Sequence, residues 1–332
     1  MNDSHYFSNQ RRLRANRHIR ELAASVVLSH RDFIQPLFID QSMSSREPIS
    51  TLTGVNSDTI ASAIEQIAAD LKKGVSKFLL FPVPREKKDS KFDFSFVSKA
   101  VKEIRTAFGD SVWLASDLCL CAYTSHGHCG ILSSDRSRVL NNETVQILAQ
   151  YALQLAESGI DCIAPSDLMD SRVAAIRDTL NVNGYDYVSI MSYSSKFTSY
   201  YYGPFRDACK SEPGGKNILQ DRKTYQISPY NTGDAIQSAY RDIEEGADII
   251  MIKPALLNLD ILTRLKQTIQ SPLAVYHVSG EYQSIELLAQ QKSIERDKGH
   301  LEVWTSLKRG GADMIISYAS RHAREWIENM EY

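Results

Sequence analysis

The chain has 332 residues, a length that suits one large domain with extensions or two ordinary domains. Its 38 Lys and Arg residues nearly balance 40 Asp and Glu, and a formal net charge of −2 gives no general case for binding nucleic acid or a membrane surface. No apolar run approaches the roughly 20 residues that span a bilayer. The N-terminus also lacks the apolar region of a signal peptide, so we expect a cytoplasmic protein. In that compartment cysteines are more often metal ligands or free thiols than disulfides.

The N-terminal segment, residues 1–30, precedes the first strand-like run and is basic. We interpret it as a solvated arm that docks on another subunit. An arm that binds nucleic acid is the alternative, but nothing else in the chain is basic. The arginines of the segment are Arg11, Arg12, Arg14, Arg17 and Arg20.

Eight short apolar runs follow, and each predicts a β-strand. Their apolar residues are nearly continuous, which is typical of parallel strands buried on both faces. The runs are 33–40, 77–84, 112–120, 162–168, 188–195, 249–255, 273–280 and 314–319.

Helical patterns lie between the predicted strands. Residues 59–73 and 143–158 place apolar side chains three and four positions apart, as in an amphipathic helix. Glycines at positions where such helices should stop are Gly74, Gly159, Gly246 and Gly310. Eight strands that alternate with helices predict an α/β fold, a (β/α)8 TIM barrel over residues 31–332. A doubly wound open sheet is the alternative, and the absence of a G-x-G-x-x-G fingerprint after the first strand weakens it.

Residues 197–224 form a long connection after the fifth predicted strand. Connections of this length in compact domains are usually lids or binding loops, and on a barrel this one would lie at the carboxyl end of the strands, where active sites form. Arg206 and Arg222 lie within it. Arginine binds carboxylates bidentately, although a surface ion pair is the ordinary role of a loop arginine.

Three cysteines follow the third predicted strand in the segment DLCLCAYTSHGHCG. Cys119 and Cys121 are alternate residues and can face one ion, and the following loop can return Cys129 as a third thiolate ligand. Three protein ligands leave a fourth position open, which distinguishes a catalytic zinc from a structural one. His126 and His128 are possible additional ligands. The alternative is a set of loop thiols without a metal.

Two lysines end predicted strands. Lys253 lies in the apolar run IIMIKPA, where lysine is rarely buried without a partner or a purpose, and Lys196 ends the fifth strand. An apolar pocket or a second cation lowers the pKa of a lysine, and the neutral amine can then form a Schiff base with a ketone. The alternative is one exposed and one salt-bridged lysine.

Other polar residues end the predicted strands and face the same end of a barrel. Each of them could instead cap a helix or bond to a loop, so the argument depends on the set. They are Asp117, Ser166, Asp167, Ser279, Glu281 and Tyr318.

These segments together resemble the porphobilinogen synthase family, also called 5-aminolevulinate dehydratase. The resemblance runs from the arm to the last strand. The matching stretches are RRLR, FIQPLFI, DLCLCAYTSHGHCGIL, APSDLMDSRVAAIRDTL, IMSYSSKF, YYGPFRDA, DRKTYQ, GADIIMIKPAL, LAVYHVSGEY and GADMIISY.

The resemblance implies a hydro-lyase of tetrapyrrole (heme) biosynthesis, which condenses two molecules of 5-aminolevulinate to porphobilinogen with loss of two waters. It further implies a homo-octamer and a catalytic zinc held by Cys119, Cys121 and Cys129. Lys253 would form a Schiff base with the first substrate and Lys196 with the second, with Asp117 beside the reacting groups. The implied substrate-binding residues are Arg206 and Arg222 for the second carboxylate, Ser279 and Tyr318 for the first, and Tyr202, Phe205 and Gln226 along the pocket.

Two departures from the family pattern bear on function. Ser238 stands where many bacterial relatives have a glutamate of an activating magnesium site, which puts an allosteric Mg²⁺ in doubt. Ser171 replaces the usual glycine, which strains the backbone if a positive φ is required there. Two rival functions are a class I aldolase, which would not explain the second lysine or the cysteines, and a barrel that has lost catalysis. The intact set of lysines, cysteines and lid arginines argues against the second rival.

Overall fold

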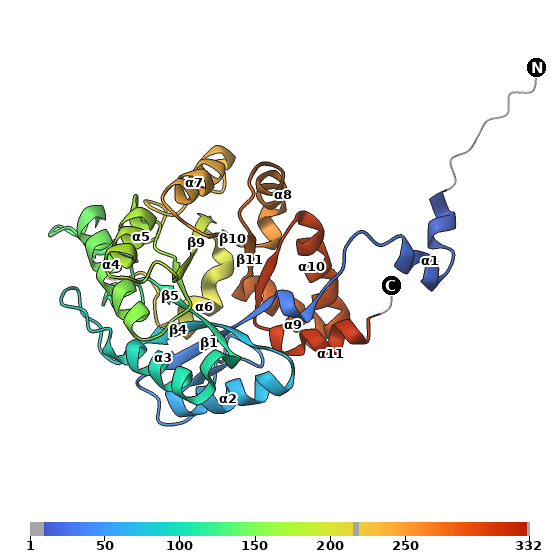
Figure 1. Ribbon diagram of the computed structural model, residues 1–332, viewed down its shortest axis with the longest axis horizontal. Coiled ribbons are helices and arrows are strands. Elements are labelled where there is room, and N and C mark those ends of the chain that lie inside the picture. The colour runs from blue at the N-terminus through green and yellow to red at the C-terminus, as the bar shows by residue number, and fades with distance from the viewer. Residues whose placement is uncertain (1–9, 215–218, 331–332) are drawn as a thin grey trace, which may run out of the picture.

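The computed structural model describes residues 10–214 and 219–330 as a closed barrel of eight parallel strands surrounded by helices (Figure 1). Each barrel strand pairs with the next in chain order, and the last pairs with the first. The predicted (β/α)8 barrel and all eight predicted strands are confirmed. The barrel strands are β1 (Phe33–Asp40), β4 (Lys77–Val83), β5 (Trp113–Leu118), β8 (Cys162–Pro165), β9 (Ser189–Lys196), β10 (Ile249–Lys253), β11 (Leu273–His277) and β12 (Met314–Ser317).

Helices cover the outside of the barrel and bury its apolar strands from both sides. All eight residues of β1 are buried, as the continuous apolar run predicts. No helix of the described residues is both long and apolar enough to cross a membrane. The outer helices are α2 (Ile60–Lys72), α3 (Ser95–Phe108), α4 (Asn141–Glu157), α5 (Arg172–Val182), α7 (Thr232–Glu244), α8 (Leu259–Thr268), α9 (Ser279–Gln290), α10 (Arg296–Gly310) and α11 (Ala323–Glu328).

The loops between these elements contain short strands and 3-10 turns. β2 (Glu47–Pro48) and β3 (Asn56–Asp58) lie after β1, and β6 (Ile131–Leu132) pairs with β7 (Val139–Leu140) beyond the cysteine loop. The 3-10 turns are η1 (Gln10–Arg14), η2 (His30–Asp32), η3 (Gly109–Ser111), η4 (Tyr200–Tyr202), η5 (Leu256–Asn258) and η6 (Ser320–His322).

Three of the four predicted helix-ending glycines take the left-handed conformation just past a helix: Gly74, Gly159 and Gly246 have φ of 87°, 90° and 100°. The fourth prediction was wrong by one residue. Gly310 is the last residue of α10, and the next residue, Gly311, has the positive φ of 114°.

The described part of the N-terminal segment leads away from the barrel (Figure 1). Its helix α1 (Arg17–Leu22) has no buried residue, and Leu22 is 82% exposed. Residues 1–9 of the predicted arm lie outside the described residues. The long connection after β9 contains η4 and the short helix α6 (Gly203–Ala208).

Candidate active site

Lys196 and Lys253 end adjacent strands, β9 and β10, and are direct partners in the register of the two strands. Both are buried, and Lys253 is 3% exposed. The Nζ atom of Lys196 donates a hydrogen bond to the backbone carbonyl of Ser166, at the end of β8. The structure therefore brings the two predicted lysines together at the carboxyl end of the barrel.

Aromatic rings surround the amine of Lys253. Its Nζ atom lies 4.1 Å from the ring centre of Tyr276, 4.7 Å from Phe205, 5.1 Å from Tyr193 and 5.3 Å from Tyr202. The pKa of Lys253 is lowered to about 7, chiefly by burial and next by the neighbouring Lys196, whereas Asp117 opposes the shift. A substantial fraction of the amine is thus neutral near neutral pH, and this is the nucleophilic form.

Asp117 is the charged counterpart of the two lysines. It lies on β5, and burial raises the pKa of its carboxyl group, while Lys196 and Lys253 act in the opposite direction. The position next to both amines agrees with the predicted place beside the reacting groups. A carboxyl group whose pKa is raised by burial is suited to exchange protons with a substrate.

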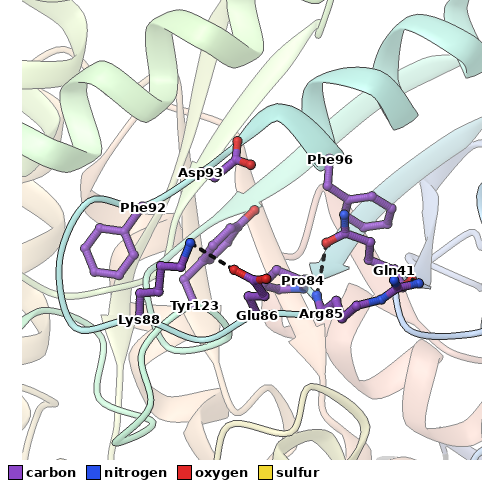
Figure 2. Close-up of a pocket in the computed structure, with 9 residues that line it drawn as sticks. All are labelled: Gln41, Pro84, Arg85, Glu86, Lys88, Phe92, Asp93, Phe96 and Tyr123. Carbon is purple, nitrogen blue, oxygen red and sulfur yellow. Dashed lines mark hydrogen bonds and ion pairs between the residues drawn. The ribbon is translucent and has the colours of Figure 1, made fainter.

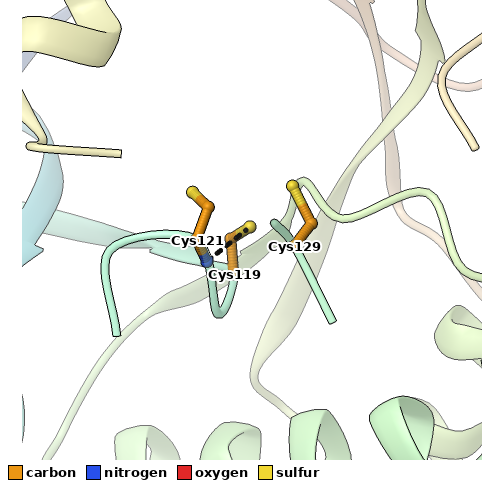
Figure 3. A group of neighbouring side chains, drawn as sticks. All are labelled: Cys119, Cys121 and Cys129. Carbon is orange, nitrogen blue, oxygen red and sulfur yellow. Dashed lines mark hydrogen bonds between the residues drawn. The ribbon is translucent and has the colours of Figure 1, made fainter. Parts of the chain in front are cut away.

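The three predicted metal ligands form a buried cluster. Their Sγ atoms all lie within 4.8 Å of one another, and Figure 3 shows Cys119 and Cys121 on one segment facing Cys129 on another. A tetrahedral zinc with Zn–S bonds of about 2.3 Å requires sulfurs about 3.8 Å apart, so a small contraction would complete the site. Hydrogen bonds from the thiols of Cys119 and Cys121, together with the charge of Arg222, hold the pKa of Cys129 well below its usual value. A site that stabilises a thiolate fits a dication.

The two histidines of the loop have other partners. His128 places its Nδ1 atom 3.0 Å from the hydroxyl of Tyr225 and its Nε2 atom 2.8 Å from the carbonyl of Leu219. The Nδ1 atom of His126 accepts a hydrogen bond from the backbone of His128. Among the described residues, the metal-ligand cluster contains the three cysteines and neither histidine.

The lid brings two arginines to the metal loop. Arg222 is buried, and its Nη2 atom donates to the carbonyls of Gly127 and Ser211 at 2.8 and 2.7 Å. Gly127 has a φ of 72°, and a Cβ atom there would lie 2.4 Å from the carbonyl of Glu212, so only glycine permits this close approach. Burial and the nearby Arg222 both lower the pKa of Arg206.

Several buried polar atoms of the lid, and of the carboxyl end of the barrel that it covers, have no hydrogen-bond partner among the described residues. They include Nε of Arg206, Nε of Arg222 and both amide atoms of Gln226. Buried polar groups of this kind are normally satisfied, so their concentration here indicates a site for a polar, anionic ligand.

The remaining predicted residues join the lid to the barrel. The Oγ atom of Ser279 accepts a hydrogen bond from the backbone of Phe205 and donates to the carbonyl of Tyr201, both at 3.1 Å. The hydroxyl of Tyr318 accepts from Tyr276, and the hydroxyl of Tyr202 donates to the carbonyl of Phe197. All the predicted site residues thus gather at one end of the barrel.

The sequence reasoning missed Tyr193, whose ring lies between the two lysines. Strict alternation along β9 puts Tyr193 and Lys196, three residues apart, on opposite faces. The register of β9 against β10 shifts between Ile250 and Ile252, because Ile250 pairs with Ser192 and Ile252 with Ser195. This extra residue rotates Tyr193 onto the same side as Lys196.

A cavity of about 250 Å³ lies on the outer rim, between Gln41, the loop after β4 and Tyr123 of the metal loop (Figure 2). Its polar groups pair with one another. The Nζ atom of Lys88 lies 2.9 Å from Glu86, and the backbone of Arg85 donates to Gln41 at 3.0 Å. Within the described part of the chain, none of the buried polar atoms without a partner belongs to a residue that lines this cavity, so it offers less to a polar ligand than the carboxyl end of the barrel does.

Comparison with known proteins agrees with this geometry. The family model described as Delta-aminolevulinic acid dehydratase matches residues 7–326. The chain belongs to this family. Its activity is that of a hydro-lyase that forms porphobilinogen from 5-aminolevulinate. The family is metal-dependent, and the cysteine cluster is where this chain can bind a metal.

Curated relatives of the family match nearly the whole chain. The delta-aminolevulinic acid dehydratase of Bacillus subtilis is 38% identical over 98% of this chain and 99% of its own. That of Helicobacter pylori is 41% identical, with 96% and 97% covered. The crystal structure of the Toxoplasma gondii enzyme, in complex with its product porphobilinogen, has a TM-score of 0.91 and 33% identity, and covers 98% of this chain and 93% of that one.

Proposed function

We propose that this chain makes porphobilinogen through Schiff bases on Lys253 and Lys196, with zinc bound by Cys119, Cys121 and Cys129. The observation that carries the proposal is the pair of buried lysines on adjacent strands beside Asp117. A bound zinc would supply Lewis-acid polarisation of a substrate oxygen or hold a substrate amine.

The residues of the chain have separate tasks in this mechanism. The neutral amine of Lys253 attacks the ketone of the first substrate, water leaves, and the iminium carbon accepts electron density. Lys196 does the same for the second substrate. Asp117 accepts or returns a proton beside the two amines. The two substrates then join through one carbon–carbon and one carbon–nitrogen bond. The bonds from the substrates to both lysine nitrogens break, and the lysines leave as free amines. Loss of a proton makes the ring aromatic, and the two waters lost in Schiff-base formation are the two waters lost for each pyrrole made.

The lid residues bind and orient. Arg206 and Arg222 bind the carboxylate of the second substrate, and their unpartnered Nε atoms support this role. Gln226 supplies an amide to the same pocket, with Tyr202 and Phe205 along its wall. Ser279 and Tyr318 bind the carboxylate of the first substrate. Closure of the lid excludes water and holds two substrates together, so that their condensation becomes effectively unimolecular.

One experiment tests the function. The purified protein is incubated with 5-aminolevulinate, and pyrrole formation and bound metal are measured on the same sample. Pyrrole should form, a strong chelator should abolish it, and zinc should restore it. Full activity in a sample shown to be free of metal contradicts the zinc site, and absence of pyrrole in a zinc-loaded sample contradicts the function.

Magnesium should have little effect on this enzyme. Ser238 is buried on α7, and its Oγ atom accepts a hydrogen bond from Nη2 of Arg241 at 3.0 Å. The carboxylates around this position, Asp170, Asp242 and Glu245, already pair with Arg241, and the hydroxyl of Ser238 does not replace the missing anionic ligand. We predict no stimulation by Mg²⁺ at saturating zinc, measured as the initial rate of pyrrole formation. A several-fold activation would place a magnesium site elsewhere in the assembly.

We further propose that the protein is a cytoplasmic homo-octamer whose arms pack on neighbouring subunits. The support is the helix α1 of the arm, which has no buried residue: an ordered helix of this kind costs conformational entropy unless it buries surface on a partner. All five cysteines are free thiols, as suits a reducing compartment.

A further inference from the structure

Glu281 is a buried carboxylate that the mechanism above does not use. It lies in the first turn of α9 and is 3% exposed. No Lys, Arg or His side chain of the described part of the chain forms an ion pair with it within 4.0 Å. Burial raises the pKa of Glu281 to about 7, and backbone N–H groups oppose the shift. A buried carboxylate without a cation is costly and calls for a structural or functional reason.

Backbone hydrogen bonds replace the missing cation. The Oε1 atom of Glu281 accepts from the N–H groups of Leu256 and Leu257 at 2.8 and 3.3 Å, and Oε2 accepts from Val278 at 2.9 Å. Leu256 and Leu257 open the turn η5, directly after the β10 loop, whereas Val278 precedes α9. One carboxylate therefore joins the loops that follow two adjacent strands.

The first of these loops carries Lys253. Only Pro254 and Ala255 separate the lysine from Leu256, and the N–H of Ala255 donates to the carbonyl of Tyr276 at 3.0 Å. The ring of Tyr276 is the nearest of those around the Lys253 amine. The loop is thus fixed at two points, one on β11 and one on Glu281.

The second loop carries Ser279, which holds the lid. Its Oγ atom bonds to the backbone of Tyr201 and Phe205, and the next residue, Gly280, packs so closely that a Cβ atom would lie 2.7 Å from the carbonyl of Tyr201. The position of the start of α9 therefore sets the position of the lid. Glu281 couples this position to that of the Lys253 loop.

We propose that Glu281 is a positioning residue, whose carboxylate fixes the loop after Lys253 against the Ser279 loop and so sets the approach of the Lys253 amine to the first substrate. The inference rests on the proposed role of Lys253. The hydrogen bonds of Glu281 all go to backbone N–H groups of the two loops, so in this proposal it acts through the backbone and not by contact with the reacting atoms.

Replacement of Glu281 with Gln tests this role. An amide keeps one acceptor oxygen but turns an N–H₂ group toward backbone N–H donors, so at least one of the three bonds is lost. A displacement of the order of 1 Å at a reacting group costs up to about a hundredfold in rate. We expect the rate of borohydride-trapped adduct formation on Lys253, at saturating 5-aminolevulinate, to fall by roughly ten- to a hundredfold. Peptide mapping by mass spectrometry locates and quantifies the adduct.

Glu286→Gln is the matched control. Glu286 lies on the same helix, is also buried at 2% exposure, and bonds to Arg296 and His300, away from the Lys253 loop. Its replacement disturbs α9 but should leave the adduct rate unchanged. If Glu281→Gln fails to fold, Glu281→Asp provides the measurement: it keeps the charge but is one methylene shorter, and its adduct rate should lie between those of the wild type and Lys253→Met.

The outcomes separate the two proposals. A wild-type enzyme with no adduct on Lys253 overturns the Schiff-base assignment and the positioning role with it. A normal wild-type adduct with an equal rate in the folded Glu281 variant overturns the positioning role alone. An equal loss in the Glu286 control also overturns it, because the effect would then report general damage to α9.

Discussion

At the scale of single residues, the environment of Lys253 decides its chemistry. Four aromatic rings replace water around the ammonium group, and Lys196 adds a second positive charge on the adjacent strand. Both effects favour the neutral amine, and they bring the pKa of Lys253 to about 7 from its ordinary value of 10.5. The protein thus obtains a nucleophile near neutral pH from packing and charge alone.

The rate of Schiff-base formation should follow this pKa. Because the pKa is lowered, the neutral fraction rises as pH increases through about 7 and is nearly complete one to two units above it. We expect the initial rate of adduct formation on Lys253 to rise over this window and then reach a plateau, measured by borohydride trapping at fixed times. A rate that still rises near the ordinary lysine pKa of about 10.4 would contradict the lowered value.

Lys253→Met should separate folding from chemistry. Methionine keeps the apolar bulk among the rings and removes the amine, so we expect a folded, zinc-loaded protein that makes essentially no pyrrole. Lys102→Met, an exposed change on α3, is the control and should keep normal activity. Near-normal turnover of the Lys253 variant would require another mechanism.

Cys121→Ala should weaken zinc binding and leave the barrel intact. Even changes to residues that only support the metal ligands typically lower metal affinity by about 10–100-fold. Removal of one of the three thiolates should therefore lower the zinc affinity by more than roughly tenfold. Competition with a chromophoric chelator measures the affinity, and circular dichroism measures the fold. Cys162→Ala removes a buried thiol of β8 outside the cluster and should bind zinc normally. Equal affinities in the two variants would remove Cys121 from the site.

At the scale of elements, the loops after the strands carry strain that the strands do not. Ser171, just before α5, has a φ of 62° in the left-handed region and no side-chain cap. The family pattern has glycine here, and the strain foreseen for a non-glycine residue is present. The helix begins correctly in spite of it, because Arg172 is fully buried and bonds to Asp242 and Ser192.

Ser171→Gly should therefore stabilise the protein slightly. The left-handed conformation costs a residue with a Cβ atom about 1–2 kcal/mol, and the greater freedom of glycine in the unfolded chain returns about 0.5–1 kcal/mol of this. We expect a net gain of about 0.5–1 kcal/mol, measured by chemical denaturation. Ser134→Gly, an exposed change in the turn before β7 at a residue without a positive φ, controls for glycine alone, and it should not stabilise. A loss of stability in the Ser171 variant would show that Ser171 makes a compensating interaction.

At the scale of the whole molecule, the barrel and the arm differ in the contacts that stabilise them. The barrel is closed by its own strands, whereas the described part of the arm packs on little of its own chain. Deletion of residues 1–25 should give smaller and less active assemblies, because the arm then cannot bury surface on a neighbour. Light scattering measures the mass. The same mass before and after deletion would contradict the role of the arm in assembly.

The sequence by itself determined the barrel and the position of the chemistry. Continuous apolar runs predict strands that are buried on both faces. Because the carboxyl ends of parallel barrel strands lie on one side, Lys196, Lys253 and the cysteine segment were expected to lie close together there. These inferences depend on local pattern and on the geometry that every barrel shares. Resemblance to the family then supplied roles for individual residues.

Only the tertiary structure decided the surroundings of each reactive group, and with them its pKa and its orientation. The rings around Lys253 come from β9, β11 and the lid, and no local pattern joins them. The extra residue in β9 turned Tyr193 toward the lysines, against the alternation of an ideal strand. Two of the three N–H donors to Glu281 lie on the loop after β10, 25 and 24 residues earlier in the chain. Burial, register and backbone donors depend on contacts between distant segments, and the chain acquires these contacts only when the barrel closes.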